Sequence, residues 1–126
     1  MVHVLRGRTL HIPETGDTGH LFVVLTNKCQ RGMVLLAPIC TQRTKHDRTC
    51  LLGVGDHDFI KQPSYIMYAK MQLFIADELE KKIAIGFIST RNRFSDNVLA
   101  LICEGVRQSG FSAPKFQNYY SAHHLL

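Results

Sequence analysis

The sequence has no tryptophan and no long hydrophobic run. Its longest apolar stretches, such as MVLLAPIC, are far shorter than the roughly 20 residues that a membrane helix needs. The start, MVHVLRGRTLH, lacks the apolar core of a signal peptide. We therefore expect a cytoplasmic protein without a membrane segment. The 126 residues, 45% hydrophobic and 20% charged, predict a single globular domain over residues 1–126.

Paired cysteine motifs are also absent. None of the four cysteines stands in a C-x-x-C pair, and scattered thiols without a secretion signal are mostly small buried hydrophobic residues. His46, Cys50 and His57 are residue types that zinc accepts, but their H-x3-C-x6-H spacing matches no closed zinc motif. We expect no disulfide, no metal and no cofactor, and a zinc-stabilised interaction domain is the least favoured alternative.

Common catalytic and nucleotide-binding motifs are missing as well. The chain has no G-x-S-x-G nucleophile elbow and no Walker A sequence. GVGDHD is not a G-x-G-x-x-G, and the helix that this motif requires does not follow it. These absences argue against a serine hydrolase of that type and against dinucleotide or P-loop nucleotide binding.

The first half of the chain is typical of β-structure. HLFVVLT (20–26) and MVLLAPIC (33–40) are rich in residues that favour strands, and the turn NKCQRG separates them. A short strand is expected at 49–54 and an edge strand at 6–12. The run 64–74 predicts a long strand that can bend strongly and that begins after Pro63.

The second half is typical of helices. ADELEKKIAIG begins with acids, continues with lysines and ends at Gly86, while SDNVLALICEGVRQSG begins at a plausible N-cap, Ser95. Gly105 costs the second helix about 1 kcal/mol unless close packing requires it. Segment 87–94 is expected to be a loop, and the tail KFQNYYSAHHLL is either a short helix or a frayed end. Strands followed by helices indicate an α+β domain, with a curved sheet or barrel over about 1–75 and helices on one side over about 76–126.

Positive charge gathers in the first 75 residues, which hold nine Lys/Arg against five Asp/Glu within a formal net charge of +5. The densest piece is QRTKHDR, residues 42–48. A loop of this kind binds phosphate or nucleic acid, or is simply solvated.

The stretch HDRTC has two interpretations. His46 and Asp47 are adjacent, and adjacent side chains in an extended segment point to opposite faces, so they do not form a catalytic dyad. The pair either belongs to a site or forms an Asp turn in which Thr49 is hydrogen-bonded locally.

GVGDHDF leaves a similar choice. Gly53, Gly55 and Asp56 favour a tight polar turn. His57 between two carboxylates can instead act as an imidazolium that donates to phosphate or serves as a general acid. Phe59 and Ile60 are expected to enter the core and to hold the turn in place.

Two strands carry a family resemblance. GHLFVVLT followed by MVLLAPICT resembles the two early strands of the PemK/MazF superfamily of small bacterial toxins, where Gly-x-Arg-Pro leads into one strand and Pro-Ile-Thr-Ser closes the next. The longer pattern of HDRTC, GDHDFIKQPSYIMY and two helices is similar to uncharacterised small bacterial proteins associated with the same barrel. The resemblance covers roughly residues 15–75.

The resemblance implies a small, strongly bent β-barrel of Src-homology-3 type followed by two C-terminal helices. It also implies a homodimer, an antitoxin-like protein partner that covers the active groove, and metal-independent cleavage of single-stranded RNA. In that reaction the ribose 2′-hydroxyl attacks its own phosphate while a base, a cation and an acid assist.

The chain departs from the family at two positions, because His20 replaces the strand-leading Arg and Cys40-Thr41 replaces Thr-Ser. The hypothesis for cleavage is therefore His20 or His57 as base or acid, with Thr41 as a positioning hydroxyl. Supporting roles fall to His46, Asp47 and Asp56, and phosphate contacts to four cations: Arg43, Lys45, Arg48 and Lys61. The alternative is a non-catalytic barrel that binds RNA or a protein partner.

Overall fold

A computed structural model describes residues 4–14 and 17–125, without the side chains of Asp17 and Thr18. The chain forms strands, a short 3₁₀ turn (η1) and helices in the order β1 Thr9–Glu14, β2 Asp17–Val24, β3 Met33–Thr41, β4 Leu51–Leu52, β5 Ser64–Ile66, η1 Tyr68–Lys70, β6 Gln72–Ile75, α1 Ala76–Ala84, β7 Ser89–Arg91, α2 Asp96–Gln108 and α3 Pro114–His123.

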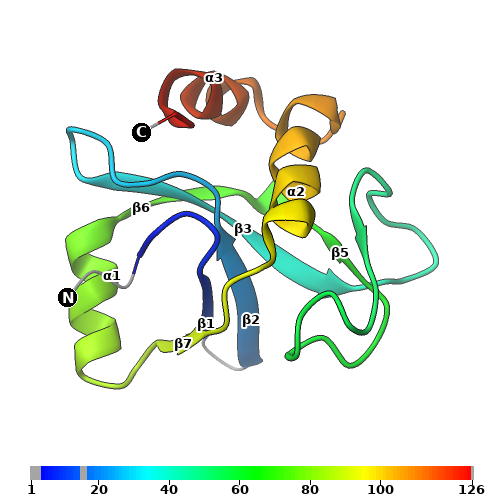
Figure 1. Cartoon of the computed structure of the whole chain (residues 1–126), viewed down its shortest axis with the longest axis horizontal. Helices are drawn as coiled ribbons and strands as arrows, with labels where there is room; N and C mark the ends of the chain where they lie inside the picture. Colours follow the sequence, from blue (N-terminus) through cyan, green and yellow to red (C-terminus); the bar gives the residue numbers. More distant parts are fainter. Residues whose placement is uncertain (1–3, 15–16, 126) are drawn as a thin grey trace.

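The strands form one antiparallel sheet in the order β4-β5-β3-β2-β1-β7, with β6 also paired to β3. Strand β3 crosses the centre of the molecule (Figure 1). On one side it pairs with β2, and on the other it pairs first with β6 through Met33–Leu36 and then with β5 through Ile39–Thr41. Pro38, which has no N–H to donate, stands where β3 changes from one partner to the other.

The strands β2 and β3 separate at one end. Their pairing runs from Val24 opposite Leu36 to Leu21 opposite Ile39. Beyond that point β2 remains paired with β1, as His20 faces Ile12, while Cys40 and Thr41 of β3 pair with β5. In Figure 1 the two strands point away from each other here. The sheet therefore forks, and the fork creates the candidate site.

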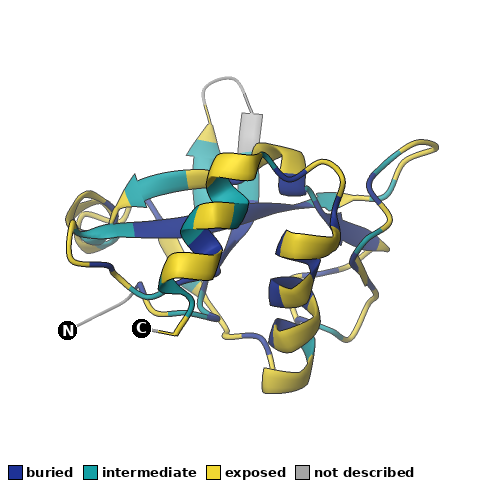
Figure 2. Ribbon diagram, turned by 90° about the horizontal axis from the view of Figure 1, so that it is seen from above, coloured by how far each residue is buried: buried dark blue, intermediate teal, exposed yellow. Residues whose placement is uncertain are grey.

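Each face of the sheet carries its own hydrophobic cluster. Alternating residues of β2 and β3, such as Leu21 and Leu35, pack with α2 and α3, whereas Phe22 and Val34 pack with α1. Buried positions lie on the strands and on the inward sides of the helices (Figure 2). The helices thus cover both faces, which corrects the expectation that they pack on one side.

The expected barrel is wrong. The seven strands form an open sheet, because β4 and β7 stand at opposite ends of the strand order and do not pair with each other among the described residues. Three helices, not two, complete an α+β fold, since the C-terminal tail forms α3. The Src-homology-3-like, strongly bent barrel is therefore replaced by a sheet that forks without closing.

Several expected elements differ in position. Strand β1 lies between β2 and β7, so it is not an edge strand, and the edge is β7, within a segment expected to be a loop. The run 64–74 is interrupted by η1 between β5 and β6. The strand expected at 49–54 is reduced to Leu51–Leu52.

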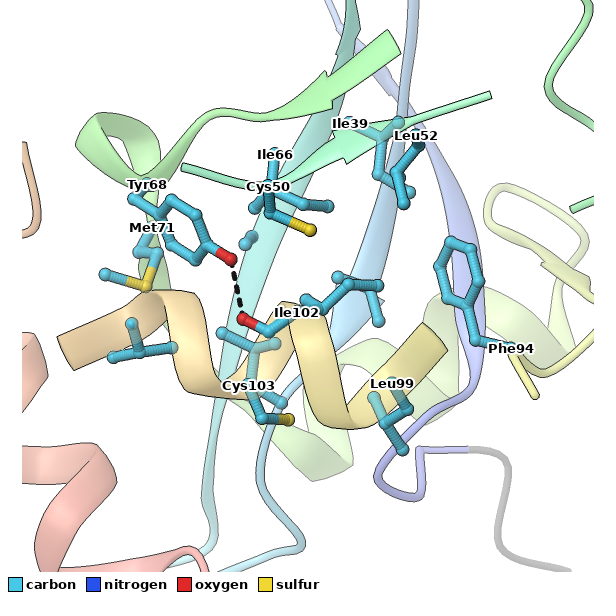
Figure 3. Packing of buried hydrophobic residues seen from close by; sticks show 14 of the residues in the cluster. Ile39, Cys50, Leu52, Ile66, Tyr68, Met71, Phe94, Leu99, Ile102 and Cys103 are labelled. Carbon is cyan, nitrogen blue, oxygen red and sulfur yellow. Dashed lines mark hydrogen bonds between the residues drawn. The ribbon is translucent and has the colours of Figure 1, made fainter. Parts of the chain in front are cut away.

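Helix α2 packs unusually close to η1. The Tyr68 hydroxyl donates to the Ile102 carbonyl at 2.6 Å, and a Cβ on Gly105 would overlap that hydroxyl (Figure 3). Close packing therefore explains the glycine inside this helix. The helix begins as expected, because Ser95 Oγ accepts the Val98 N–H at 3.3 Å.

Within residues 4–14 and 17–125, no helix has both the length and the apolar character needed to cross a membrane.

Candidate functional site

A groove of about 1120 Å³ fills the fork between β2 and β3. One wall comes from the β1–β2 hairpin through Glu14, Gly19 and His20, and the other comes from the end of β3 through Cys40 and Thr41. Gly19 is required in this hairpin, because its φ of +87° is positive and a Cβ would overlap the backbone of Ile12. Two loops, residues 42–50 (the first loop) and residues 53–63 (the second loop), complete the rim.

The rim is strongly positive. Arg43 and Lys45 come from the first loop, Lys61 from the second, and Lys70 from η1; all four are exposed. Among the described side chains that line the groove, Glu14 is the one carboxylate. Four cations facing one anion around a concave surface attract polyanions, because a groove with low-dielectric walls focuses the field of its charges.

Cys40, on the β3 wall of the groove, is influenced by charged groups from both the first loop and the β1–β2 hairpin. Burial raises the pKa of the Cys40 thiol, the guanidinium of Arg43 opposes that rise and the carboxylate of Glu14 adds to it. Burial also raises the pKa of the Tyr65 phenol beside it. Both groups are therefore neutral at neutral pH, and the charge of the groove comes from its rim.

The first loop is held by buried contacts on either side of its cations. The Gln42 N–H donates to the Pro63 carbonyl at 2.9 Å. Asp47, which is 9% exposed, accepts bonds from the Thr49 N–H at 2.9 Å, the Thr49 hydroxyl at 2.6 Å and the Ser109 hydroxyl at 2.6 Å. HDRTC is thus an Asp turn that is also tied to the end of α2.

His46 belongs to the same support. Its ring stacks on Tyr65 with centroids 4.7 Å apart, and its Nδ1 lies 3.0 Å from the Asp47 carbonyl. Tyr65 lines the groove. His46 does not line the groove itself. It packs against Tyr65, which does.

The second loop is held by His57, which is 5% exposed. Its Nε2 lies 2.6 Å from the Asn92 carbonyl and 3.1 Å from the Thr9 hydroxyl, and its Nδ1 accepts the Phe59 N–H at 3.0 Å. At the start of the loop, Asp56 accepts the Gly53 N–H at 2.7 Å, which closes the polar turn.

These bonds define the form of the His57 ring. Because Nδ1 accepts the Phe59 N–H, the neutral ring carries its proton on Nε2, which donates to Asn92. An Asp58 oxygen lies 3.2 Å from Nδ1. Because Nδ1 carries no proton in this form of the ring, that contact is not a hydrogen bond. Both ring nitrogens are engaged, and this favours a structural role for His57 over acid–base chemistry.

The structure brings half of the expected site residues together in the groove. His20 and Thr41 line the groove together with Arg43, Lys45 and Lys61. His46 and Asp47 lie behind the wall of the first loop, and Asp56 and His57 fix the second. Arg48 is exposed but does not line the groove.

Other groove residues were not predicted. Glu14 and Lys70 lacked a local signal, because their positions depend on how the hairpin and η1 meet the fork. Phe59 was expected in the core but is 38% exposed, whereas its neighbour Ile60 is 4% exposed. Only Ile60 anchors the loop in the core, and Phe59 lines the groove.

Across the described ranges 4–14 and 17–125, no three His, Cys, Asp or Glu side chains gather as the ligands of a metal ion would. Cys29, Cys40, Cys50 and Cys103 are all free thiols.

Comparison with known proteins does not assign the chain to a family. No protein-family model matches it, and no curated protein is significantly similar in sequence.

Proposed function

We propose that the groove binds single-stranded RNA through its phosphates. The observation that carries the proposal is the set of four exposed cations around one concave surface, supplied by three separate segments. Proteins that bind single-stranded nucleic acid combine such a positive groove with exposed aromatic side chains, and Phe59, which is 38% exposed, provides one here.

The dimensions of the groove also favour an extended ligand. Sites for small molecules are enclosed pockets of about 300–1,000 Å³. This groove has about 1120 Å³ and lies open between two parts of a sheet. A polymer with regularly spaced negative charges uses such a surface more fully than a small anion does.

Fluorescence anisotropy with an unstructured oligouridylate tests the proposal. If each of the four cations contacts a phosphate, the logarithm of affinity falls against the logarithm of salt with a slope of about −3. The double substitution Arg43→Ala and Lys61→Ala should make that slope shallower by about 1.4. Lys82→Ala removes an exposed cation of α1 that does not line the groove and serves as the control.

Two results would count against RNA binding. The wild-type protein could show no salt-dependent affinity for the oligonucleotide, or the double variant could bind like the Lys82→Ala control. The competing interpretation, a groove for a protein partner, predicts capture of an acidic peptide segment with no affinity for the oligonucleotide.

Cleavage of the bound RNA is a second candidate function, and the placement of His20 favours it. His20 lines the groove with Thr41 and the cations proposed to bind phosphate, whereas His57 does not line it. Neutral His20 takes the proton of the ribose 2′-hydroxyl as that oxygen attacks phosphorus. The P–O5′ bond then breaks on the opposite side of phosphorus, where solvent water protonates the leaving oxygen, and the imidazolium of His20 releases its proton to solvent. The products are a 2′,3′-cyclic phosphate and a 5′-hydroxyl.

End-labelled RNA incubated with the protein in EDTA tests cleavage directly. His20→Ala should abolish product while the affinity for a 2′-O-methyl oligonucleotide, which cannot react, stays within about twofold. Product formed equally by His20→Ala would remove His20 from the reaction. Binding without any product in the wild type would leave the protein as a binding module.

The biological setting is part of the same proposal. A cytoplasmic, homodimeric toxin-like protein controlled by an antitoxin-like partner is the setting that the family resemblance implies. Growth arrest on expression, relieved by a neighbouring reading frame and absent with His20→Ala, is the expected result.

A further inference from the structure

A second groove of about 720 Å³ adjoins the first, and its two arginines are unused by the proposed site. Arg8 of the chain before β1 and Arg91 of β7 line it, and the Arg8 guanidinium donates to the Arg91 carbonyl at 3.3 Å. Asp58 is the one carboxylate among the described residues that line it. The charge of this second groove is therefore also positive.

The two grooves share residues and so form one surface. Phe59 and Lys61 of the second loop line both. The loop between them is fixed from inside by His57 and Ile60, while Lys61 faces solvent. A ligand that runs from the first groove into the second therefore passes Phe59 and Lys61, and Arg8 lines the second groove.

Phe59 is built as a platform for a flat ligand group. The guanidinium carbon of Arg91 lies over its ring, 5.1 Å from the centroid, and the His11 ring lies 5.9 Å away at a tilt of 43°. The phenylalanine keeps 38% of its surface exposed, and its N–H is held by His57. The ring is thus exposed at the surface on a backbone held by His57, and the guanidinium of Arg91 lies beside it.

We infer that the Phe59–Arg91 pair is a base-stacking subsite that joins the two grooves. The inference rests on the proposed RNA binding and adds a ligand class to it: a single strand with an unpaired base, whose phosphates contact Lys61 on one side and Arg8 on the other. Aromatic rings and guanidinium planes both stack on nucleobases, and a base inside a duplex cannot reach them.

Two probes separate base stacking from charge. A 2′-O-methyl oligouridylate carries bases and phosphates and resists cleavage, whereas inorganic polyphosphate carries charge alone. Phe59→Ala should weaken oligonucleotide binding between about fivefold and about 150-fold, the range expected for one stacked base. Its affinity for polyphosphate should stay within about twofold of the wild type. Phe59→Tyr, which keeps the aromatic face, should restore oligonucleotide affinity.

Phe111→Ala is the matched control, because Phe111 is also exposed, at 63%, and lines neither groove. An oligonucleotide with 2-aminopurine adds a direct signal, since its fluorescence should fall on binding to the wild type and not on binding to Phe59→Ala. Equal thermal stability of the variants shows that the fold is kept.

The outcomes distinguish this inference from the function on which it rests. If the wild type binds the oligonucleotide and Phe59→Ala binds it equally well, the stacking subsite is refuted while phosphate binding in the first groove stands. Equal losses for oligonucleotide and polyphosphate also refute it, because they show a change in charge placement. If the wild type binds neither probe, the proposed function itself fails.

Discussion

Each of the two loops that frame the groove is fixed by one buried polar residue, which is an acid in the first loop and a histidine in the second. The first loop buries an acid, Asp47, and leaves its neighbour His46 partly accessible. The second loop buries a histidine, His57, and leaves Asp58 exposed. In both, the buried polar residue makes several hydrogen bonds, including at least one to a distant segment, and cations nearby in sequence face solvent. Anchoring and ligand contact are therefore assigned to different residues of the same loop.

Removing the acid anchor should have the largest effect. Asp47→Ala leaves the Thr49 N–H and two hydroxyls without their acceptor, and we expect a loss of about 3 kcal/mol in the free energy of unfolding. Urea denaturation measures it. Asp56→Ala is the control, since Asp56 accepts only one exposed backbone bond, and it should cost less than about 1 kcal/mol. Similar losses in the free energy of unfolding for the two variants would contradict the view that Asp47 anchors its loop whereas Asp56 only closes a turn.

Removing the histidine anchor should cost somewhat less. His57→Ala exposes no buried charge. It leaves the Phe59 N–H without its acceptor and removes one of two donors to the Asn92 carbonyl, which still accepts from the Thr9 hydroxyl at 2.7 Å, for an expected loss of about 2 kcal/mol. Amide exchange at Phe59 should quicken more than exchange at Thr49 of the first loop. An inactive His57→Ala that keeps full stability would instead show that this ring belongs to the reaction.

Alkaline pH should weaken the end of the first loop. Burial raises the pKa of Cys50 from 9.0 to about 11, so the unfolded chain releases this proton first. Its contribution to stability is complete below pH 9.0 and is lost as pH rises through about 11, by about 1–2 kcal/mol. Urea midpoints across this range measure it, and Cys50→Ala should flatten the curve. Burial raises the pKa of the Tyr120 phenol to about 12, so its ionisation adds a similar decline in stability at higher pH.

Removing the exposed cations should have the smallest effect on stability. Arg43→Ala and Lys61→Ala should each change the free energy of unfolding by less than about 0.5 kcal/mol, because both side chains are exposed. Differential scanning calorimetry measures this alongside the binding assays. A large loss in either variant would mean that the rim also supports the fold.

The sequence revealed the local elements better than their arrangement. Apolar runs located β2 and β3, Ser95 marked the start of α2, and the condition placed on Gly105 was met by its packing against Tyr68. The fork was not predictable, because it depends on which partner β3 takes on either side of Pro38. Local patterns report what a segment can form, and strand pairing is decided by segments far apart in the chain.

The anchors show the same limit. Asp47 and His57 were each recognised as polar turn residues or site residues, but the choice depended on remote partners. The Ser109 that Asp47 contacts lies 62 positions away, and the Asn92 that His57 contacts lies 35 positions away. His57, which was expected in a polar turn or a site, is buried because of these remote partners, and Phe59, which was expected in the core, is exposed.

The separation of anchors from rim cations has a consequence for protein engineering. Arg43, Lys45 and Lys61 are exposed, whereas Asp47 and His57 are buried, so we expect that the rim charges can be reversed while the two anchors keep both loops in place. A groove rebuilt with glutamates at these positions should select cationic peptides on an unchanged scaffold. The same scaffold could therefore bind different ligands, because a few exposed side chains around the fork determine which ligand it prefers.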